Sequence, residues 1–151
     1  MLLECSFRDL GQACTYPVPI SDWERIDRIL SQGRQSFLGL ETLDGREVFI
    51  NLTHMQACRV LATKQHLGPP NPEPELSYYM LGSGLMKMVD VDLEWLPNAT
   101  MTIESFDELD DRFTAIPDEF GITTFINLDD LIYLEFPSAW MDEALEEEGE
   151  I

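Results

Sequence analysis

Basic residues are scarce in this sequence. Its 151 residues hold 9 Lys and Arg against 29 Asp and Glu, which gives a net charge of −20. Nucleic acids and anionic membranes are bound largely through Lys and Arg that displace counterions from phosphates. We therefore expect no direct binding of nucleic acid or membrane, and a basic protein is the favoured kind of partner.

Cysteines and long apolar runs are also few. The three cysteines are Cys5, Cys14 and Cys58, and an odd number predicts reduced thiols rather than a disulfide framework. The start, MLLECSFRDL, has neither the basic region nor the apolar region of a secretory signal. No apolar run approaches the roughly 18–20 residues of a membrane span. We expect a cytoplasmic protein.

Few side chains suited to catalysis are present. Two histidines and two lysines leave few groups for general acid–base chemistry at neutral pH. The sequence has no Gly-x-Ser-x-Gly, no phosphate-binding loop and no dinucleotide-binding fingerprint. We predict that the protein is not an enzyme and has no catalytic residues and no cofactor. An enzyme or small-ligand protein whose site is assembled from scattered residues stays an alternative.

Two patterns contain metal-ligand residue types, and neither is complete. His54 and Cys58 are four residues apart, but a zinc site needs about four ligands at such spacings. Asp90, Asp92 and Glu94 alternate along one segment, as oxygen ligands for calcium could, without the glycine and the distant glutamate of an EF-hand. We predict no metal site.

Hydrophobic residues make up 44% of the chain, enough for a packed core. An amphipathic helix is predicted near residues 22–32, with Ser21 to Glu24 as a capping box and Gly33 as its end. Asp44-Gly45 is typical of a hairpin turn, SFDELDDRF is either a short helix or an acidic loop, and a last helix begins near Ser138. The predicted strands are Val48–Leu52, Ala57–Leu61, Val89–Trp95, Thr100–Ile103, Ile122–Asn127 and Leu131–Phe136, with others on either side of Gly82-Ser83-Gly84.

One phrase occurs twice. FINL stands at residues 49–52 and again at 125–128, and an ungapped alignment of residues 45–61 with 121–137 has five identities. Asparagine after a strand favours a tight turn, so each copy predicts strand, turn, strand. Duplication and convergence of a common phrase both stay open. The helix near residues 22–32 is expected to have no counterpart in the second half.

The midpoint of the chain is rich in proline. Residues 67–75, LGPPNPEPE, predict a stiff linker. We expect a β-rich half at residues 1–66, this linker, and a second, acidic β-rich half with a C-terminal helix at residues 76–151. The predicted fold is α+β and predominantly β, with two related barrel-like halves packed as one unit, because halves this small are marginal alone.

LETLDGREVFINLTHMQACRVL, residues 40–61, resembles small SH3-like and Sm-like β-barrel modules, here in tandem. The resemblance rests on strand, tight hairpin, strand, short turn, strand. Sm-like proteins bind RNA through basic residues that this stretch lacks, so the resemblance implies a fold and no binding residues.

Charge is uneven along the chain. Residues 1–62 have 8 acids and 6 bases, whereas residues 63–151 have 21 acids and 3 bases. This asymmetry predicts a non-enzymatic interaction protein that binds a basic protein partner, with carboxylates in place of nucleic-acid phosphates. The alternative is a structural or oligomeric subunit whose acidity serves solubility, and a homodimer could form through the edge of Val89–Trp95. The residues expected at the acidic surface are Asp90, Asp92, Glu94, Asp107, Glu108, Asp110, Asp111, Asp129 and Asp130.

Overall fold

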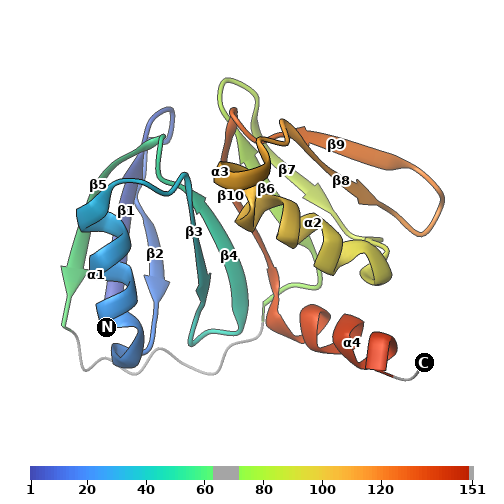
Figure 1. Cartoon of the computed structure of the whole chain (residues 1–151), viewed down its shortest axis with the longest axis horizontal. Helices are drawn as coiled ribbons and strands as arrows, with labels where there is room; N and C mark the ends of the chain where they lie inside the picture. Colours follow the sequence, from blue (N-terminus) through green and yellow to red (C-terminus); the bar gives the residue numbers. More distant parts are fainter. Residues whose placement is uncertain (63–71, 150–151) are drawn as a thin grey trace.

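The protein folds into two halves that lie side by side (Figure 1). This computed structural model describes residues 1–62 and 72–149, with side chains up to residue 146. Part of the predicted proline-rich linker, residues 67–71, lies outside the described residues.

Strands dominate both halves, which confirms an α+β fold that is mainly β. The first half contains β1 (Leu2–Phe7), β2 (Cys14–Pro17), the 3₁₀ helix η1 (Ile20–Asp22), α1 (Trp23–Gln32), β3 (Phe37–Glu41), β4 (Arg46–Asn51) and β5 (Met55–Leu61). The second half contains β6 (Leu76–Met80), β7 (Gly84–Met88), η2 (Leu93–Trp95), α2 (Leu96–Glu104), α3 (Phe106–Leu109), β8 (Phe113–Pro117), β9 (Thr123–Asn127), β10 (Leu131–Pro137) and α4 (Ser138–Gly149).

The two halves follow one plan. Each has two strands, a 3₁₀ turn, a helix and three more strands in the same order. Residue numbers differ by 73 between α1 and α2 and by 76 between β5 and β10, and the three additional residues lie at α3. The FINL phrase is therefore part of a repeat that includes the N-terminal strands and the helix.

Hydrogen bonds repeat with the same spacing. The matched pairs are Leu52 N to Ser36 O (2.7 Å) with Leu128 N to Arg112 O (2.8 Å), and Leu43 N to Pro17 O (2.7 Å) with Glu119 N to Asp90 O (2.8 Å). The β1–β5 and β6–β10 ladders also shift register at equivalent points. Convergence of one short phrase does not produce this agreement, so we infer duplication of one unit.

The helix α2 corrects two predictions. The first-half helix does have a counterpart, and Thr100–Ile103 is helical rather than a strand. Pro97 lies in the first turn, where its missing N–H costs nothing. Leu96, Ala99, Thr100 and Ile103 are buried at helical spacing, so the core-facing stripe overrides the β propensity of Thr and Ile.

Val89–Trp95 was predicted as a strand, and this prediction is wrong. Val91 makes an isolated bridge to Asp118, and the chain then enters η2. The Asp92 carboxylate accepts a hydrogen bond from Glu94 N at 3.1 Å and so caps this turn. The alternation of acids and apolar residues therefore does not form a strand face, and this segment offers no strand edge for a homodimer.

Turn chemistry explains the other boundaries. Gly33 ends α1 with φ +63°, as predicted, but no side-chain capping box forms, because the chain enters α1 from η1. Gly45 and Gly121 have φ of +80° and +86° and close equivalent hairpins. Each loop has three residues between the paired ends, a type of hairpin that requires a left-handed residue at its last position.

The halves are joined by one sheet. Its strand order is β3-β4-β10-β6-β7, so β4 of the first half pairs with β10 of the second, and we call this junction the seam. The other sheets are β2-β1-β5 and β8-β9. All three sheets are open, so the described residues close no barrel in either half.

The seam also exchanges side chains between two cores. Phe37 and Phe49 belong to the first half, yet they are buried among residues of the second-half core. Ile132 of β10 is buried in the first-half core. The halves therefore pack as one unit, because neither core is complete without residues from the other.

Candidate functional site at the junction of the two halves

The two FINL turns meet at one end of the seam. In each turn the asparagine accepts a backbone hydrogen bond two residues on: Thr53 N donates to Asn51 Oδ1 and Asp129 N to Asn127 Oδ1, both at 3.0 Å. Asn51 is also buried, and its Nδ2 donates across the seam to Leu128 O (3.1 Å) and Leu131 O (2.8 Å). The first turn thus holds the second in place.

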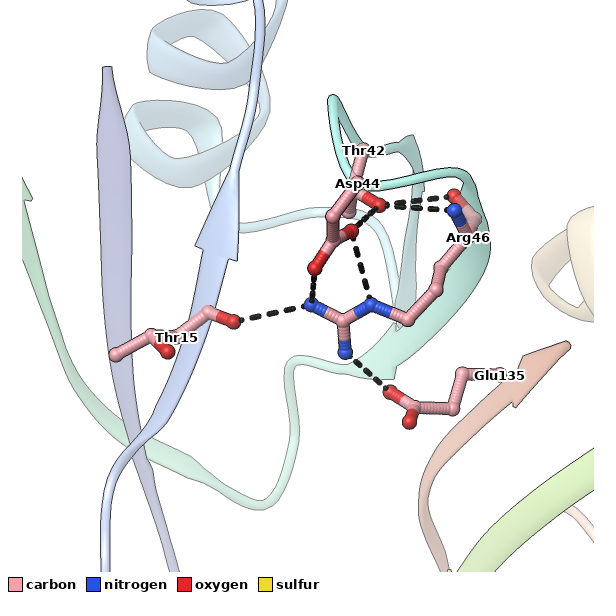
Figure 2. Close-up of polar contacts among 5 residues, drawn as sticks. All are labelled: Thr15, Thr42, Asp44, Arg46 and Glu135. Atoms are coloured by element: carbon pink, nitrogen blue, oxygen red, sulfur yellow. Dashed lines mark hydrogen bonds and ion pairs between the residues drawn. The ribbon is translucent and has the colours of Figure 1, made fainter. Parts of the chain in front are cut away.

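Arg46 joins three strands along the seam (Figure 2). Its guanidinium contacts Asp44 through two nitrogens, at 2.8 and 3.0 Å, and Glu135 of β10 at 3.0 Å. It also donates to Thr15 O at 3.3 Å and lies 5.5 Å from the centre of the Tyr16 ring. Burial raises the pKa of Glu135, and Arg46 offsets this effect. Because these partners use all three nitrogens of Arg46 and one face of its guanidinium, we assign it a structural role.

A cleft lies between the halves, beside the seam. Its volume is about 280 Å³, and its lining comes from α1, β3 and β4 together with Glu104 of α2. Glu41, Glu47 and Glu104 all line it, as do Phe37 and Phe49. Glu41 and Glu47 are directly opposite each other on β3 and β4, an arrangement that disfavours two like charges.

The cleft has more acidic than basic side chains, with Glu41, Glu47 and Glu104 against Arg25. Burial, followed by the charges of Glu41, Asp142 and Glu104, raises the pKa of Glu47 to about 7. Arg25 also lines the cleft, but its guanidinium donates to Gly39 O at 3.0 Å. Within the described residues no ion pair joins Arg25 to a cleft carboxylate. Three carboxylates against one guanidinium give the cleft a net negative potential, which an entering cation would meet.

The nine acids predicted from the sequence fall into two groups. Asp107 and Glu108 lie on α3, Asp110 and Asp111 follow it, and Asp129 and Asp130 lie in the second FINL turn. Arg112 connects these segments, since its Nε lies 3.9 Å from Asp129 Oδ2 and its carbonyl accepts from Leu128 N. We call these six residues the turn-end acids.

The other three predicted acids lie elsewhere. Asp90, Asp92 and Glu94 precede or enter η2, and Asp90 O accepts a hydrogen bond from Glu119 N in the β8–β9 loop. That loop is at the outer end of the second half, away from α3 (Figure 1). The predicted acidic surface is thus two separate surfaces.

The predicted metal-ligand residues do not converge. His54 is in the first FINL turn, where its Nε2 lies 2.6 Å from Asp129 O. Cys58 is on β5 and faces Cys5, whose Sγ donates to it at 3.8 Å. The hydrogen bond to Cys58 and burial raise the pKa of the Cys5 thiol. Among the described residues no group of three or more His, Cys, Asp and Glu has a geometry that could hold a metal ion.

The sequence did not indicate Glu41, Glu47 or Glu104 as site residues. Glu104 is more than fifty residues from the other two, and the predicted fold had no helix α2 to carry it. One signal was present: Glu47 has the same strand parity as Phe49, so it faces the second half rather than solvent.

Comparisons with family models, with curated proteins and with solved structures found no match. The resemblance to SH3-like and Sm-like modules therefore stays a prediction. Of the helices in the described part of the chain, none has the length and apolar character needed to cross a membrane.

Proposed function

We propose that this protein is a non-enzymatic interaction protein that binds a basic protein partner and receives one of its Lys or Arg side chains in the cleft between the halves. The observation that carries the proposal is the convergence of Glu41, Glu47 and Glu104 on one cleft, where burial and the neighbouring acids raise the pKa of Glu47 to about 7. Carboxylates held together in this way are stabilised when a cation enters.

The lining of the cleft suits a basic side chain. Carboxylates provide charge-assisted acceptors for an ammonium or guanidinium group. Phe37 and Phe49, which are almost wholly buried, form an apolar part of the lining beside which the aliphatic stem could lie. The large negative charge of residues 63–151 would speed the approach of a basic partner, and its spaced carboxylates would replace nucleic-acid phosphates on that partner.

The cleft also predicts how binding depends on pH. At neutral pH a fraction of Glu47 carries a proton, and an entering cation lowers its pKa. Binding therefore releases a proton, and affinity rises as pH increases through about 7. A purely surface contact between acids and bases would lack this dependence between about pH 6 and 8, because ordinary carboxylates are fully ionised there.

The test is a pull-down from native lysate at low salt with stepwise salt elution. The chain is compared with a cleft variant, Glu41→Gln, Glu47→Gln and Glu104→Gln, and with a control variant, Asp90→Asn, Asp92→Asn and Glu94→Gln. Both variants lose three negative charges. We expect one basic protein to elute above background salt from the wild type and to be lost from the cleft variant. The control variant should retain it but release it at lower salt, because part of the long-range attraction is removed. Titration calorimetry at pH 6 and 8 then measures the proton release.

Two outcomes would count against the proposal. If no protein elutes in a salt-dependent manner, the acidic surface is not a recognition surface. If both variants lose the partner equally, the cleft is not its binding site. The alternative function, an oligomeric subunit, is favoured by a different observation, the edges of β5 and β9 that pair with no strand among the described residues.

A further inference from the structure

Several strands lie at the edge of a sheet, and the repeat sets two of them apart, β5 and β9. Among the described residues, β5 pairs with β1 alone and β9 pairs with β8 alone. In the repeat, β9 corresponds to β4 and β5 corresponds to β10, the two strands that pair in the seam. A pairing of β9 with β5 would therefore repeat the β4–β10 pairing that the chain already makes in the seam.

The strand orders of the two smaller sheets agree with this correspondence. The intact sheet is β3-β4-β10-β6-β7, and its repeat equivalent would be β8-β9-β5-β1-β2. The sheets β8-β9 and β2-β1-β5 are the two parts of that equivalent, separated between β9 and β5. An exposed edge of this kind is a template for pairing with another strand.

Exposed phenylalanines indicate the same surface. Phe37 and Phe49 are 6% and 3% exposed, because they enter the core across the seam. Their repeat equivalents, Phe113 and Phe125, are 48% and 67% exposed. Phe113 and Phe125 match Phe37 and Phe49 in residue type and in position within the repeat. They differ in having, among the described residues, no neighbouring core to enter. Aromatic side chains at an exposed strand edge are typical of a protein interface.

A single chain cannot supply the missing contact. β5 and β9 lie at opposite ends of the long axis of the molecule (Figure 1). We propose that copies of this chain assemble head to tail, with β9 of one copy pairing with β5 of the next in the register of the seam. In the seam, Leu134 lies opposite Phe49. Between copies, the equivalent residues Cys58 and Phe125 would lie opposite each other. Phe49 stacks on Phe136 at 6.4 Å, and so Phe125 would contact Val60.

Charge favours this orientation over a symmetric dimer that joins two β9 edges; the mixing experiment below distinguishes it from a dimer that joins two β5 edges. Residues 63–151 have 21 acids and 3 bases, so two second halves in contact would repel. Head-to-tail contact places the acidic half of one copy against the first half of the next, where residues 1–62 have 8 acids and 6 bases. Such heterologous contacts give a closed ring if the rotation between copies closes, and a filament otherwise.

Sedimentation velocity over a range of micromolar concentrations tests the assembly. We expect species of several copies, and we expect Phe125→Asp to weaken association about 30-fold or more, since it replaces a central aromatic anchor. Phe120→Asp is the control, because Phe120 is 75% exposed on the same hairpin but is equivalent to the loop residue Asp44. A chain that is monomeric throughout, or assembly that survives Phe125→Asp, would overturn the proposal.

A mixing experiment tests the head-to-tail direction. Val60→Lys and Phe125→Glu each disrupt one edge and should prevent growth of the assembly when alone. Mixed in equal amounts they restore it, because one junction then pairs Glu with Lys and the other is unchanged. A β5-to-β5 dimer would instead be abolished by Val60→Lys and untouched by Phe125→Glu, which would disprove the orientation.

Oxidative cross-linking tests the register. In a Cys5→Ala and Cys14→Ala background, Phe125→Cys should form a disulfide with Cys58 of another copy, since directly opposite residues in an antiparallel pair lie within disulfide range. Phe120→Cys in the same background should not. Covalent multimers from both variants, or from neither, would exclude the proposed register.

Salt distinguishes self-assembly from partner binding. Partner binding weakens as salt rises, and assembly of like-charged copies does not.

Discussion

Glu47 makes the stability of the protein depend on pH in a direction opposite to most carboxylates. Its pKa is raised to about 7, so between its ordinary pKa and 7 the folded state holds a proton that the unfolded state has lost. The free energy of unfolding therefore falls as pH rises through this window and is lowest above it. The cause is local, since burial and three neighbouring acids disfavour the charged form.

Glu47→Gln should remove this dependence. Above pH 7 the variant is expected to be more stable by on the order of 1 kcal/mol, after allowance for solvent screening, and below about pH 5 equal to the wild type. Urea unfolding at four pH values between these limits measures the difference. Glu94→Gln is the control, because Glu94 is exposed. An unchanged slope in Glu47→Gln would mean that Glu47 ionises normally.

The two FINL asparagines form a matched pair in which only one crosses the seam. Asn51→Ala would leave Leu128 O and Leu131 O without their buried donor, which is expected to cost about 2–3 kcal/mol. Asn127→Ala loses an exposed turn bond and should cost less than about 1 kcal/mol. Chemical denaturation of both variants decides the matter. Equal losses would show that Asn51 contributes only to its turn.

At the scale of elements, β4 is central and β9 is at an edge although their sequences share FIN. Phe49→Ala creates a cavity in the second-half core and is expected to cost about 3–5 kcal/mol. Phe125→Ala, in the isolated chain, should change stability by no more than about 0.5 kcal/mol, because Phe125 is 67% exposed. Thermal unfolding at low protein concentration is the measurement. Comparable losses would contradict the asymmetry between the halves.

Elements with strong local signals were predicted well from the sequence. The strands around both FINL turns and the helix ending at Gly33 agree with the structure to within about two residues, because turn residues and periodicity are local properties. Asp44-Gly45 was correctly placed in a hairpin, with a longer loop than two residues. The predicted first helix, C-terminal helix and fold class are confirmed for the same reason.

Elements that depend on tertiary packing were predicted less well from the sequence. The spacing of Leu96, Ala99 and Ile103 is helical, but Thr and Ile in the same segment favour strands, and burial against the core decides between them. Val89–Trp95 has the alternation of a strand without a partner strand. The cleft could not be predicted because its carboxylates come from strands and a helix that only the seam brings together.

For the whole molecule, the net charge of −20 opposes folding through long-range repulsion. Salt reduces this repulsion, because the Debye length falls from roughly 30 Å at 0.01 M to 3 Å at 1 M. The same salt weakens attraction to a basic partner. Added salt should therefore stabilise the fold and weaken the proposed partner binding, so one salt titration distinguishes these two effects.

We expect the free energy of unfolding to rise steadily with sodium chloride, with most of the gain below about 0.2 M, where screening changes fastest. A variant with the nine predicted surface acids changed to Asn and Gln has its net charge reduced from −20 to −11. It should be more stable than the wild type at low salt and gain less from added salt, because self-repulsion depends on the total charge rather than on particular pairs.

Urea unfolding at stepped salt concentrations compares the two chains. If both chains gain equally, the salt acts through apolar burial and the repulsion is negligible. If the variant is less stable at low salt, the acids that it lacks make stabilising local contacts in the wild type. Asp107 accepts a hydrogen bond from Ser36 N at 2.8 Å, and Asp92 caps η2. A steep salt dependence in the wild type alone would show that the acidity lowers its stability, as expected of a surface retained for recognition.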